Sequence, residues 1–320
     1  MGLFGNSKPN VENFLEAVKK KNFEKVKKIL NKANETKTIL DLNKKSESGE
    51  YPLISLVKND NLEMIRFTID YSNKNNITLD WNVKDDKKRF PLLEATYCDN
   101  LNIIRDIFDY ATKKHIIIDV NSQDSEQNFP LIYAIRGNNI KIVQALMDYA
   151  DQNNFSLQMM GKDKDGAYPF FKAVACKDIE MAKLIINYAN KKNIILPMNE
   201  KTRSKYYPLL SACQGDSIDL VKLIMAYADE KRIPLILNDR NDYGECPVKW
   251  IAQHKNLDMA KLLKQYSVDH EIKLEFDEYE IAEHDYDKLT KSNFIDYRGK
   301  IIRILKDNKQ VELINEIYLN

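Results

Sequence analysis

The chain contains little glycine and proline, with 9 of each among 320 residues. These are the residues that interrupt regular structure, so the composition leaves little room for flexible linkers. No run of 18 apolar residues occurs, so no membrane-spanning helix is predicted. The first residues also lack the basic and apolar regions of a secretory signal. The net charge of +1 gives no general attraction for nucleic acid or an anionic membrane.

Residue patterns of enzymes and metal sites are missing as well. The four histidines pair with no cysteine or carboxylate at metal-ligand or catalytic-triad spacing. There is neither a P-loop nor a Gly-x-Gly-x-x-Gly motif. We therefore expect no enzymatic activity, no cofactor and no metal. No Cys-x-x-Cys pair occurs, and we expect free, buried thiols in a reducing compartment. The four cysteines are Cys98, Cys176, Cys213 and Cys246.

Proline, although scarce, recurs with a period of 39 residues. Six prolines share this register, at Pro52, Pro91, Pro130, Pro169, Pro208 and Pro247. Nineteen residues after each stands a tyrosine, at Tyr71, Tyr110, Tyr149, Tyr188, Tyr227 and Tyr266. Nine residues after each stands a helix-capping residue, at Asn61, Asn100, Asn139, Asp178, Ser217 and Asn256. A fixed period of about 20–50 residues predicts a stacked solenoid, in which each unit buries its apolar face against its neighbours.

The unit around Pro130 shows what one repeat contains. Proline suits the first position of a helix, where its missing N–H costs nothing. Gly137 ends this short helix, and Asn139 caps a second helix whose apolar residues recur at spacings of three and four. Phe155 and Leu157 then alternate with polar residues, as in an extended segment. The repeat is therefore predicted to be a short helix, a turn, a longer helix and an extended loop.

These residues resemble the ankyrin repeat. Its motif Thr-Pro-Leu-His-x-Ala corresponds to residues 129–134, and its Gly-His-x-x-Ile-Val element to residues 138–143. Its hairpin asparagine, nine residues before the proline, is replaced by Met160 in one repeat. It is present as Asn43, Asn82, Asn121, Asn199 and Asn238. The resemblance covers residues 13–285 and implies an all-α, ankyrin-like helical solenoid of helix-turn-helix repeats with extended hairpin loops.

The chain departs from the ankyrin pattern in two ways. Its period is 39 residues, against about 33 in the family. The added residues fall between the tyrosine and the hairpin asparagine, where we expect a longer outer helix and an extra Ile-x-Leu segment. Tyrosine or phenylalanine also replaces the threonine before most of the prolines. Aromatic packing is therefore expected in place of the family's Thr/His hydrogen bonds.

The periodicity defines the expected organisation of the chain. Residues 1–9 are expected to form a flexible leader, 10–48 a degenerate N-terminal capping repeat and 49–267 six regular repeats. An acidic excursion over 268–298 and C-terminal capping helices over 299–320 would follow. The excursion lacks the central glycine of a calcium-binding loop. The first repeat is lysine-rich, as a solvated cap should be, although a patch for an acidic partner is the alternative.

The resemblance implies that the short helices and hairpin tips form a concave binding face. The short-helix columns vary between repeats, and they include Tyr, Trp and Arg, which dominate binding hot spots. Candidates there are Tyr97, Tyr133, Arg136, Trp250, Lys172 and Gln214. The hairpins carry a basic column suited to an acidic partner, with candidates Lys84, Lys162, Lys201 and Arg240. The alternative for the short-helix columns is that they vary because nothing constrains an exposed surface. The alternative for the basic hairpin column is that its residues were inherited from one ancestral repeat.

These features predict a non-enzymatic, cytoplasmic scaffold or adaptor, expected to be monomeric, that binds an unknown protein partner. The alternative is a peripheral-membrane adaptor tethered through an acylated Gly2 and the basic first repeat. Membrane binding is not expected without that acylation. The acylation pattern requires Ser or Thr where Asn6 stands, with Ser7 next to it. A nucleic-acid binder is disfavoured by the net charge.

Overall fold

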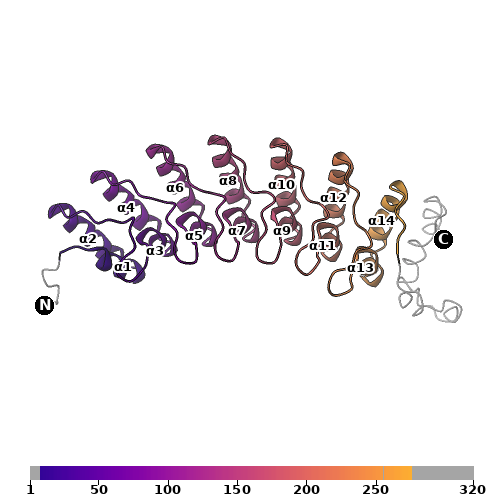
Figure 1. Cartoon of the computed structure of the whole chain (residues 1–320), viewed down its shortest axis with the longest axis horizontal. Coiled ribbons are helices and arrows are strands. Elements are labelled where there is room, and N and C mark those ends of the chain that lie inside the picture. The colour runs from indigo at the N-terminus through magenta and orange to yellow at the C-terminus, as the bar shows by residue number, and fades with distance from the viewer. Residues whose placement is uncertain (1–7, 255, 276–320) are drawn as a thin grey trace. The chain divides into compact units, whose positions relative to one another are not determined.

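The computed structural model describes residues 8–254 and 256–275 (Figure 1). Within these residues every regular element is a helix, which confirms the all-α class. The chain divides into two compact units, Met1–Lys164 and Asp165–Asn320, called unit 1 and unit 2.

The described part of unit 1 contains four pairs of helices, each with a shorter first and a longer second member. The shorter helices are α1 (Val11–Lys19), α3 (Pro52–Lys58), α5 (Pro91–Tyr97) and α7 (Pro130–Arg136). The longer helices are α2 (Phe23–Glu35), α4 (Leu62–Lys74), α6 (Leu101–Lys114) and α8 (Ile140–Gln152). Each helix contacts its counterpart in the next pair, so the shorter helices form one row and the longer helices a second (Figure 1).

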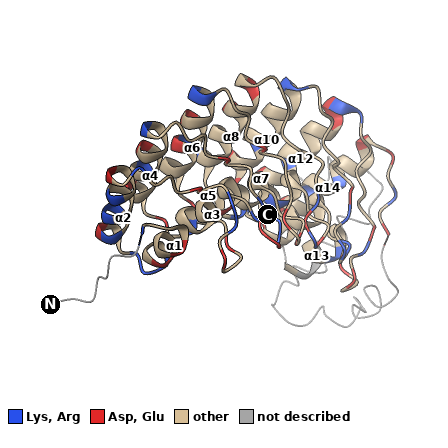
Figure 2. Cartoon of the chain, turned by 60° about the vertical axis from the view of Figure 1, so that its left-hand side comes forward, with Lys and Arg blue, Asp and Glu red and all other residues tan. Residues whose placement is uncertain are grey.

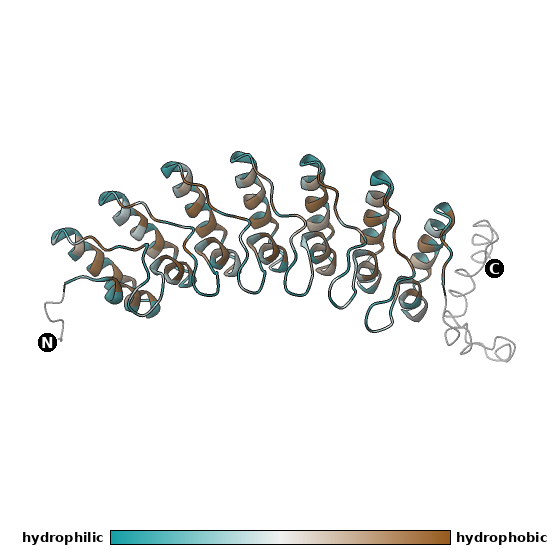
Figure 3. Cartoon of the chain, in the orientation of Figure 1, coloured by the Kyte–Doolittle hydropathy of each residue, from teal (hydrophilic) through white to brown (hydrophobic). Residues whose placement is uncertain are grey.

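The described part of unit 2 repeats this arrangement with three pairs. Its shorter helices are α9 (Pro169–Ala175), α11 (Pro208–Gln214) and α13 (Pro247–His254). Its longer helices are α10 (Ile179–Lys191), α12 (Ile218–Lys231) and α14 (Leu257–Asp269). Apolar residues concentrate where the shorter and longer helices of a pair face each other, and the hairpin loops are hydrophilic (Figure 3).

The helix starts lie where the repeat columns predict them. Every shorter helix from α3 to α13 begins at its proline. Every longer helix from α4 to α14 is preceded by its capping residue, and Asn22 caps α2 in the same way. The oxygen of each cap side chain accepts a backbone N–H of the first turn, as Asn139 Oδ1 does from Ile142 at 3.1 Å.

The tyrosine column anchors the extended segment of the preceding repeat. Tyr110 Oη accepts the backbone N–H of Leu79 at 2.8 Å, and Tyr149 Oη accepts that of Ile118 at 2.9 Å. The same bond joins Tyr71 to Leu40 in unit 1 and Tyr227 to Leu196 in unit 2. These bonded residues are buried. The tyrosines therefore fix the residues that lengthen this repeat.

The hairpin asparagines join consecutive loops. Asn82 Nδ2 donates to the carbonyl of Ile117 at 2.9 Å, and Asn82 Oδ1 accepts the N–H of Asp119 at 2.9 Å. The same pair of bonds is made by Asn43, Asn121, Asn199 and Asn238. Each amide therefore satisfies one acceptor and one donor of the following repeat. Met160, which replaces asparagine in this column, is 51% exposed.

The substitution Asn82→Ala tests this ladder. We expect it to lower the free energy of unfolding of unit 1 by about 1 kcal/mol, because two partly exposed backbone hydrogen bonds lose their partner. Chemical denaturation in urea measures the change. Asn102→Ala is the matched control, since Asn102 is an exposed residue of α6. The control should be neutral or slightly stabilising, because alanine favours the helix; an equal loss in both variants would contradict a specific role for Asn82.

Aromatic packing takes the place of the family's Thr/His bonds, as expected. In unit 1, Phe90 and Phe129 precede their prolines and are completely buried. In unit 2, Tyr168 and Tyr207 occupy the same position and are also completely buried. Their hydroxyls reach backbone carbonyls: Tyr168 Oη donates to Pro197 at 2.5 Å, and Tyr207 Oη to Asp239 at 2.9 Å.

The cysteines differ from the expectation of four buried thiols. Cys213 and Cys246 are buried, but Cys176 is exposed and Cys98 is half-buried. Cys98 and Cys176 are the C-cap residues of α5 and α9. The expectation is wrong for these two because a short helix ends there and its last turn faces solvent. No disulfide joins any of these four described cysteines.

We expect Cys176 to be the first of these thiols to react with a maleimide. Burial raises the pKa of Cys213, so this thiol is both covered and poorly ionised in the folded protein. Cys213 should react only in denaturant. Mass spectrometry of peptides from briefly labelled protein measures the order, with the Cys176→Ser variant as the control. Early labelling of Cys213 would contradict the described packing of unit 2.

The ends of the chain are only partly described. Helices α1 and α2 occupy the region expected to be the capping repeat, and their lysines are interspersed with acidic residues (Figure 2). Lys20 and Lys25 pair with Glu16, and Lys27 pairs with Glu24. Gly2, most of the leader, the excursion from residue 276 onward and the expected helices over 299–320 lie outside the described residues.

Candidate partner-binding site

Three of the residues expected to bind a partner form one surface cluster in unit 1. Tyr97 ends α5, while Tyr133 and Arg136 lie one turn apart on the neighbouring α7. The tyrosine rings meet edge to face, with centroids 5.5 Å apart and an interplanar angle of 83°. The guanidinium carbon of Arg136 is 5.7 Å from the centroid of the Tyr133 ring. These three side chains, called the Tyr97 cluster, are therefore in contact before any partner binds.

The exposure of the cluster suits a binding surface. Tyr97 is 68% exposed, Arg136 is exposed and Tyr133 is half-buried. The Tyr133 hydroxyl lies 3.4 Å from Asp124 Oδ2, and Asp124 is held by backbone N–H groups of its own hairpin. Burial, followed by the Asp124 charge, raises the pKa of Tyr133 to about 12. The phenol therefore remains protonated near neutral pH and keeps its contact with Asp124.

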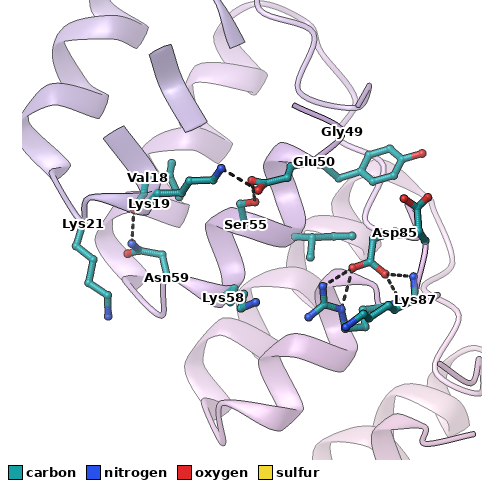
Figure 4. A pocket seen from close by; sticks show the side chains of 14 residues that line it. Val18, Lys19, Lys21, Gly49, Glu50, Ser55, Lys58, Asn59, Asp85 and Lys87 are labelled. Carbon is teal, nitrogen blue, oxygen red and sulfur yellow. Dashed lines mark hydrogen bonds and ion pairs between the residues drawn. The ribbon is translucent and has the colours of Figure 1, made fainter. Parts of the chain in front are cut away.

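A groove of 490 Å³ lies over α1, α3 and the hairpin that precedes α5 (Figure 4). Its lining includes Lys19, Lys21, Glu50, Lys58, Lys87 and Arg89. Lys19 Nζ pairs with Glu50 Oε1 at 2.8 Å, and Arg89 Nη2 pairs with Asp85 Oδ2 at 2.6 Å. Lys58 holds the same position in α3 that Tyr97 holds in α5, and α3 contacts α5. The groove therefore borders the Tyr97 cluster.

The remaining short-helix candidates lie in unit 2, each on a different helix. Gln214, which ends α11, donates from Nε2 to Glu245 Oε2 at 2.8 Å. Trp250 is half-buried in α13 and stacks on His254, with ring centroids 3.7 Å apart. Lys172 is half-buried in α9. Contacts within the unit hold Gln214 and Trp250, and their role toward a partner stays a prediction.

The basic hairpin column makes contacts within the protein. Lys84 Nζ lies 2.5 Å from Ser122 Oγ and 3.5 Å from Asp119 Oδ2. Lys201 pairs with Asp239, and Arg240 Nη1 donates to the carbonyl of Gly244 at 2.8 Å. Lys162 is exposed. For Lys84, Lys201 and Arg240 these contacts define a structural role, whereas binding of an acidic partner by the column stays a prediction.

Sequence reasoning missed three features of these surfaces: the burial of Glu94, the exposure of Tyr243 and the groove. Glu94 lies on α5 one turn before Tyr97, yet it is only 5% exposed. Tyr243 in unit 2 is 71% exposed and has its ring centroid 6.2 Å from that of Tyr206. The sequence did place Glu94 on the same face as Ser55 and Tyr133, because these three residues share one repeat position. It did not show that the carboxylate is covered. The sequence contained no comparable signal for the groove.

Comparison with known proteins agrees with the repeat pattern. Residues 108–195 match the family model for ankyrin repeats, in three copies. The crystal structure of the ankyrin repeat domain of Bcl-3, described as a unique member of the IkappaB protein family, has a TM-score of 0.51 with this chain. It is 16% identical, and the alignment covers 77% of this chain and 94% of that one. No curated protein matches the sequence. Residues 108–195 therefore match ankyrin repeats, and the chain has the ankyrin-repeat fold.

The described residues offer neither a membrane-spanning helix nor a metal-binding cluster. None of the helices found there has the length and apolar character needed to cross a membrane. Within the same residues, no three His, Cys, Asp or Glu side chains come together as a group that could hold a metal ion.

Proposed function

We propose that this chain is a non-enzymatic, cytoplasmic scaffold or adaptor that binds a protein partner through the Tyr97 cluster. Ankyrin repeats in general mediate protein–protein interactions. The observation that carries the proposal is the contact of Tyr97, Tyr133 and Arg136 on adjacent helices, with Tyr97 68% exposed. These residue types are the ones that most often dominate binding energy at protein interfaces.

The geometry of the cluster reduces the entropic cost of binding. Tyr133 is held by Tyr97 on one side and by Asp124 at its hydroxyl. Arg136 lies near the Tyr133 ring and forms no ion pair within the described residues. A partner would therefore meet side chains that are already ordered and a cation that is available. Such preorganisation converts more of the contact energy into affinity.

Affinity capture from native lysate tests the proposal. The wild-type chain is compared with the Tyr97→Ala/Tyr133→Ala/Arg136→Glu variant, after circular dichroism has shown that both are folded. Tyr243→Ala is the matched control, because Tyr243 is 71% exposed in unit 2. We expect the triple variant to retain about one tenth or less of the captured partner, and the control to retain most of it.

A partner that the triple variant retains at the wild-type level would place the binding site elsewhere. Equal loss in the triple variant and in Tyr243→Ala would show that exposed aromatic residues in general, rather than the Tyr97 cluster, determine capture. Either result would contradict the proposed site.

A further inference from the structure

The short helices of unit 1 place an exposed aromatic side chain between two cations. Lys58 in α3, Tyr97 in α5 and Arg136 in α7 occupy the same position in three consecutive repeats. Adjacent members of this series lie on helices that contact each other. Lys21 and Lys87 line the groove with Lys58 (Figure 4). Among the described residues, none of these four cations forms an ion pair.

Most of the neighbouring carboxylates are neutralised or covered. Asp60 and Asp99, two residues after Lys58 and Tyr97, are exposed and accept hydrogen bonds from the side-chain amides of Asn100 and Asn139. Glu50 pairs with Lys19 at 2.8 Å, Asp85 with Arg89 at 2.6 Å and Asp86 with Lys45 at 2.5 Å. Glu126 pairs with Lys164 at 3.0 Å. Glu94 is 5% exposed, with its Oε1 3.4 Å from Arg89 Nη1, and Asp124 is 8% exposed. The lining of the groove itself therefore keeps positive charge, with five cations against three carboxylates, although the whole chain is almost neutral.

The spacing of the helices fits an extended peptide. Neighbouring packed helices lie about 8–10 Å apart, so Lys58 and Arg136 are about 20 Å from each other across α5. An extended chain rises about 3.3 Å per residue and spans that distance in about six residues. One more helix spacing reaches the groove residue Lys21. About nine residues would then cover the whole series.

We infer that the partner segment is an extended acidic peptide with a central aromatic or leucine side chain. The apolar side chain would pack on Tyr97 and Tyr133. Its carboxylates would lie on either side, at Arg136 and at the groove residues Lys21, Lys58 and Lys87. This inference rests on the proposed function and specifies the kind of segment that the same site takes.

A nucleic acid fits this surface less well. Its backbone carries a charge at every nucleotide and would bring phosphates close to the exposed carboxylates Asp60 and Asp99, which follow Lys58 and Tyr97 by two residues. An acidic peptide instead concentrates its charge where its sequence places it. Tyr97 is an exposed aromatic residue between the cations Lys58 and Arg136. This order matches a peptide in which one apolar side chain lies between two acidic ones.

A displayed library of random peptides of about twelve residues, selected on the full chain, tests the inference. Selection on wild type is combined with counter-selection on Lys58→Glu/Arg136→Glu. The control variant is Arg105→Glu/Lys113→Glu, which makes the same change in net charge at exposed positions of α6. Circular dichroism confirms that all three proteins are folded before the selection.

We expect the enriched peptides to carry net negative charge and an aromatic residue or leucine. They should bind the Lys58→Glu/Arg136→Glu variant at least about tenfold more weakly than wild type, and the control within about threefold of wild type. A synthetic copy with lysine at its acidic positions should show the reverse preference, binding the double variant better than wild type. That reversal cannot arise from loss of folding.

Enrichment of neutral or basic peptides, or of none, would overturn the inference. So would equal weakening by the α6 control, because net charge alone would then explain binding. A single-stranded oligonucleotide that displaces the peptide at a lower concentration than an acidic competitor peptide would assign the surface to nucleic acid. If capture of the native partner still depends on the Tyr97 cluster in any of these cases, the proposed function survives and only the peptide class is wrong.

Discussion

Replacing Tyr110 with alanine is expected to lower the free energy of unfolding of unit 1 by about 3–5 kcal/mol. Tyr110 is 4% exposed, and its ring meets the completely buried Trp81 edge to face, with centroids 6.0 Å apart. Its hydroxyl also accepts the N–H of Leu79. The substitution therefore creates a cavity, removes an aromatic contact and leaves a buried donor without its partner. Tyr110→Phe isolates the last effect and should cost about 1–2 kcal/mol.

Trp81 provides the measurement, because the chain has only two tryptophans and Trp250 lies in the other unit. In a Trp250→Phe background, urea unfolding followed by tryptophan fluorescence reports on the surroundings of Trp81. Tyr97→Ala is the control within unit 1, since Tyr97 is 68% exposed. Its transition should shift little. A Tyr110→Ala midpoint that equals that of the control would show that the tyrosine column does not anchor the extended segments.

The helices of this fold could be predicted because the determinants of their ends are local. Proline at the first position and a capping side chain nine residues later act within a few residues of chain. Six repeated copies of a weak signal then define the register, even though no single copy would. The asparagine and tyrosine columns were also visible, but their partners are not local. Asn82 and Tyr110 bond to backbone atoms 31 to 37 residues away, which requires knowledge of how repeats stack.

Burial at individual surface positions was less predictable, because it depends on neighbours from other repeats. Cys98 and Cys176 share a column, yet one is half-buried and the other exposed. Glu94 and Tyr97 lie on one short helix, and the carboxylate rather than the aromatic ring is the covered side chain. Repeat position predicts which helix carries a residue, whereas its surroundings are set by side chains that vary between repeats.

The candidate site illustrates the same limit. The columns predicted that Tyr97, Tyr133 and Arg136 would lie on neighbouring short helices, and the structure places them in contact. The basic hairpin column looked equally regular in the sequence. Its members Lys84 and Lys201, however, reach acidic residues of the following loop, as Lys84 does toward Asp119 at 3.5 Å. The partner of such a cation comes from the following repeat. A single column of the sequence therefore does not reveal whether the cation is paired.

Glu94→Gln is expected to stabilise unit 1 at neutral pH by about 1–2 kcal/mol. Burial raises the pKa of Glu94 above the ordinary 4.5, although the charges of Arg89 and Lys58 act in the opposite direction. Asp85 and Asp124 add to the rise. The folded state then binds this proton more strongly than the unfolded state does. As the pH increases above about 4.5, ionisation of the buried carboxyl therefore costs the folded state free energy.

Urea denaturation of wild type and Glu94→Gln from pH 4 to pH 8 measures this cost, since the difference between the two curves isolates the one carboxyl. The difference should be near zero at the acidic end, where the protonated acid and the amide are equivalent. It should grow in favour of the variant as the pH rises. Glu63→Gln, at an exposed position of α4, should show no such trend. If Glu94→Gln instead became less stable than wild type with rising pH, the contact with Arg89 at 3.4 Å would outweigh burial. Glu94 would then be a stabilising ion-pair partner in the row of short helices rather than a buried charge held there at a cost.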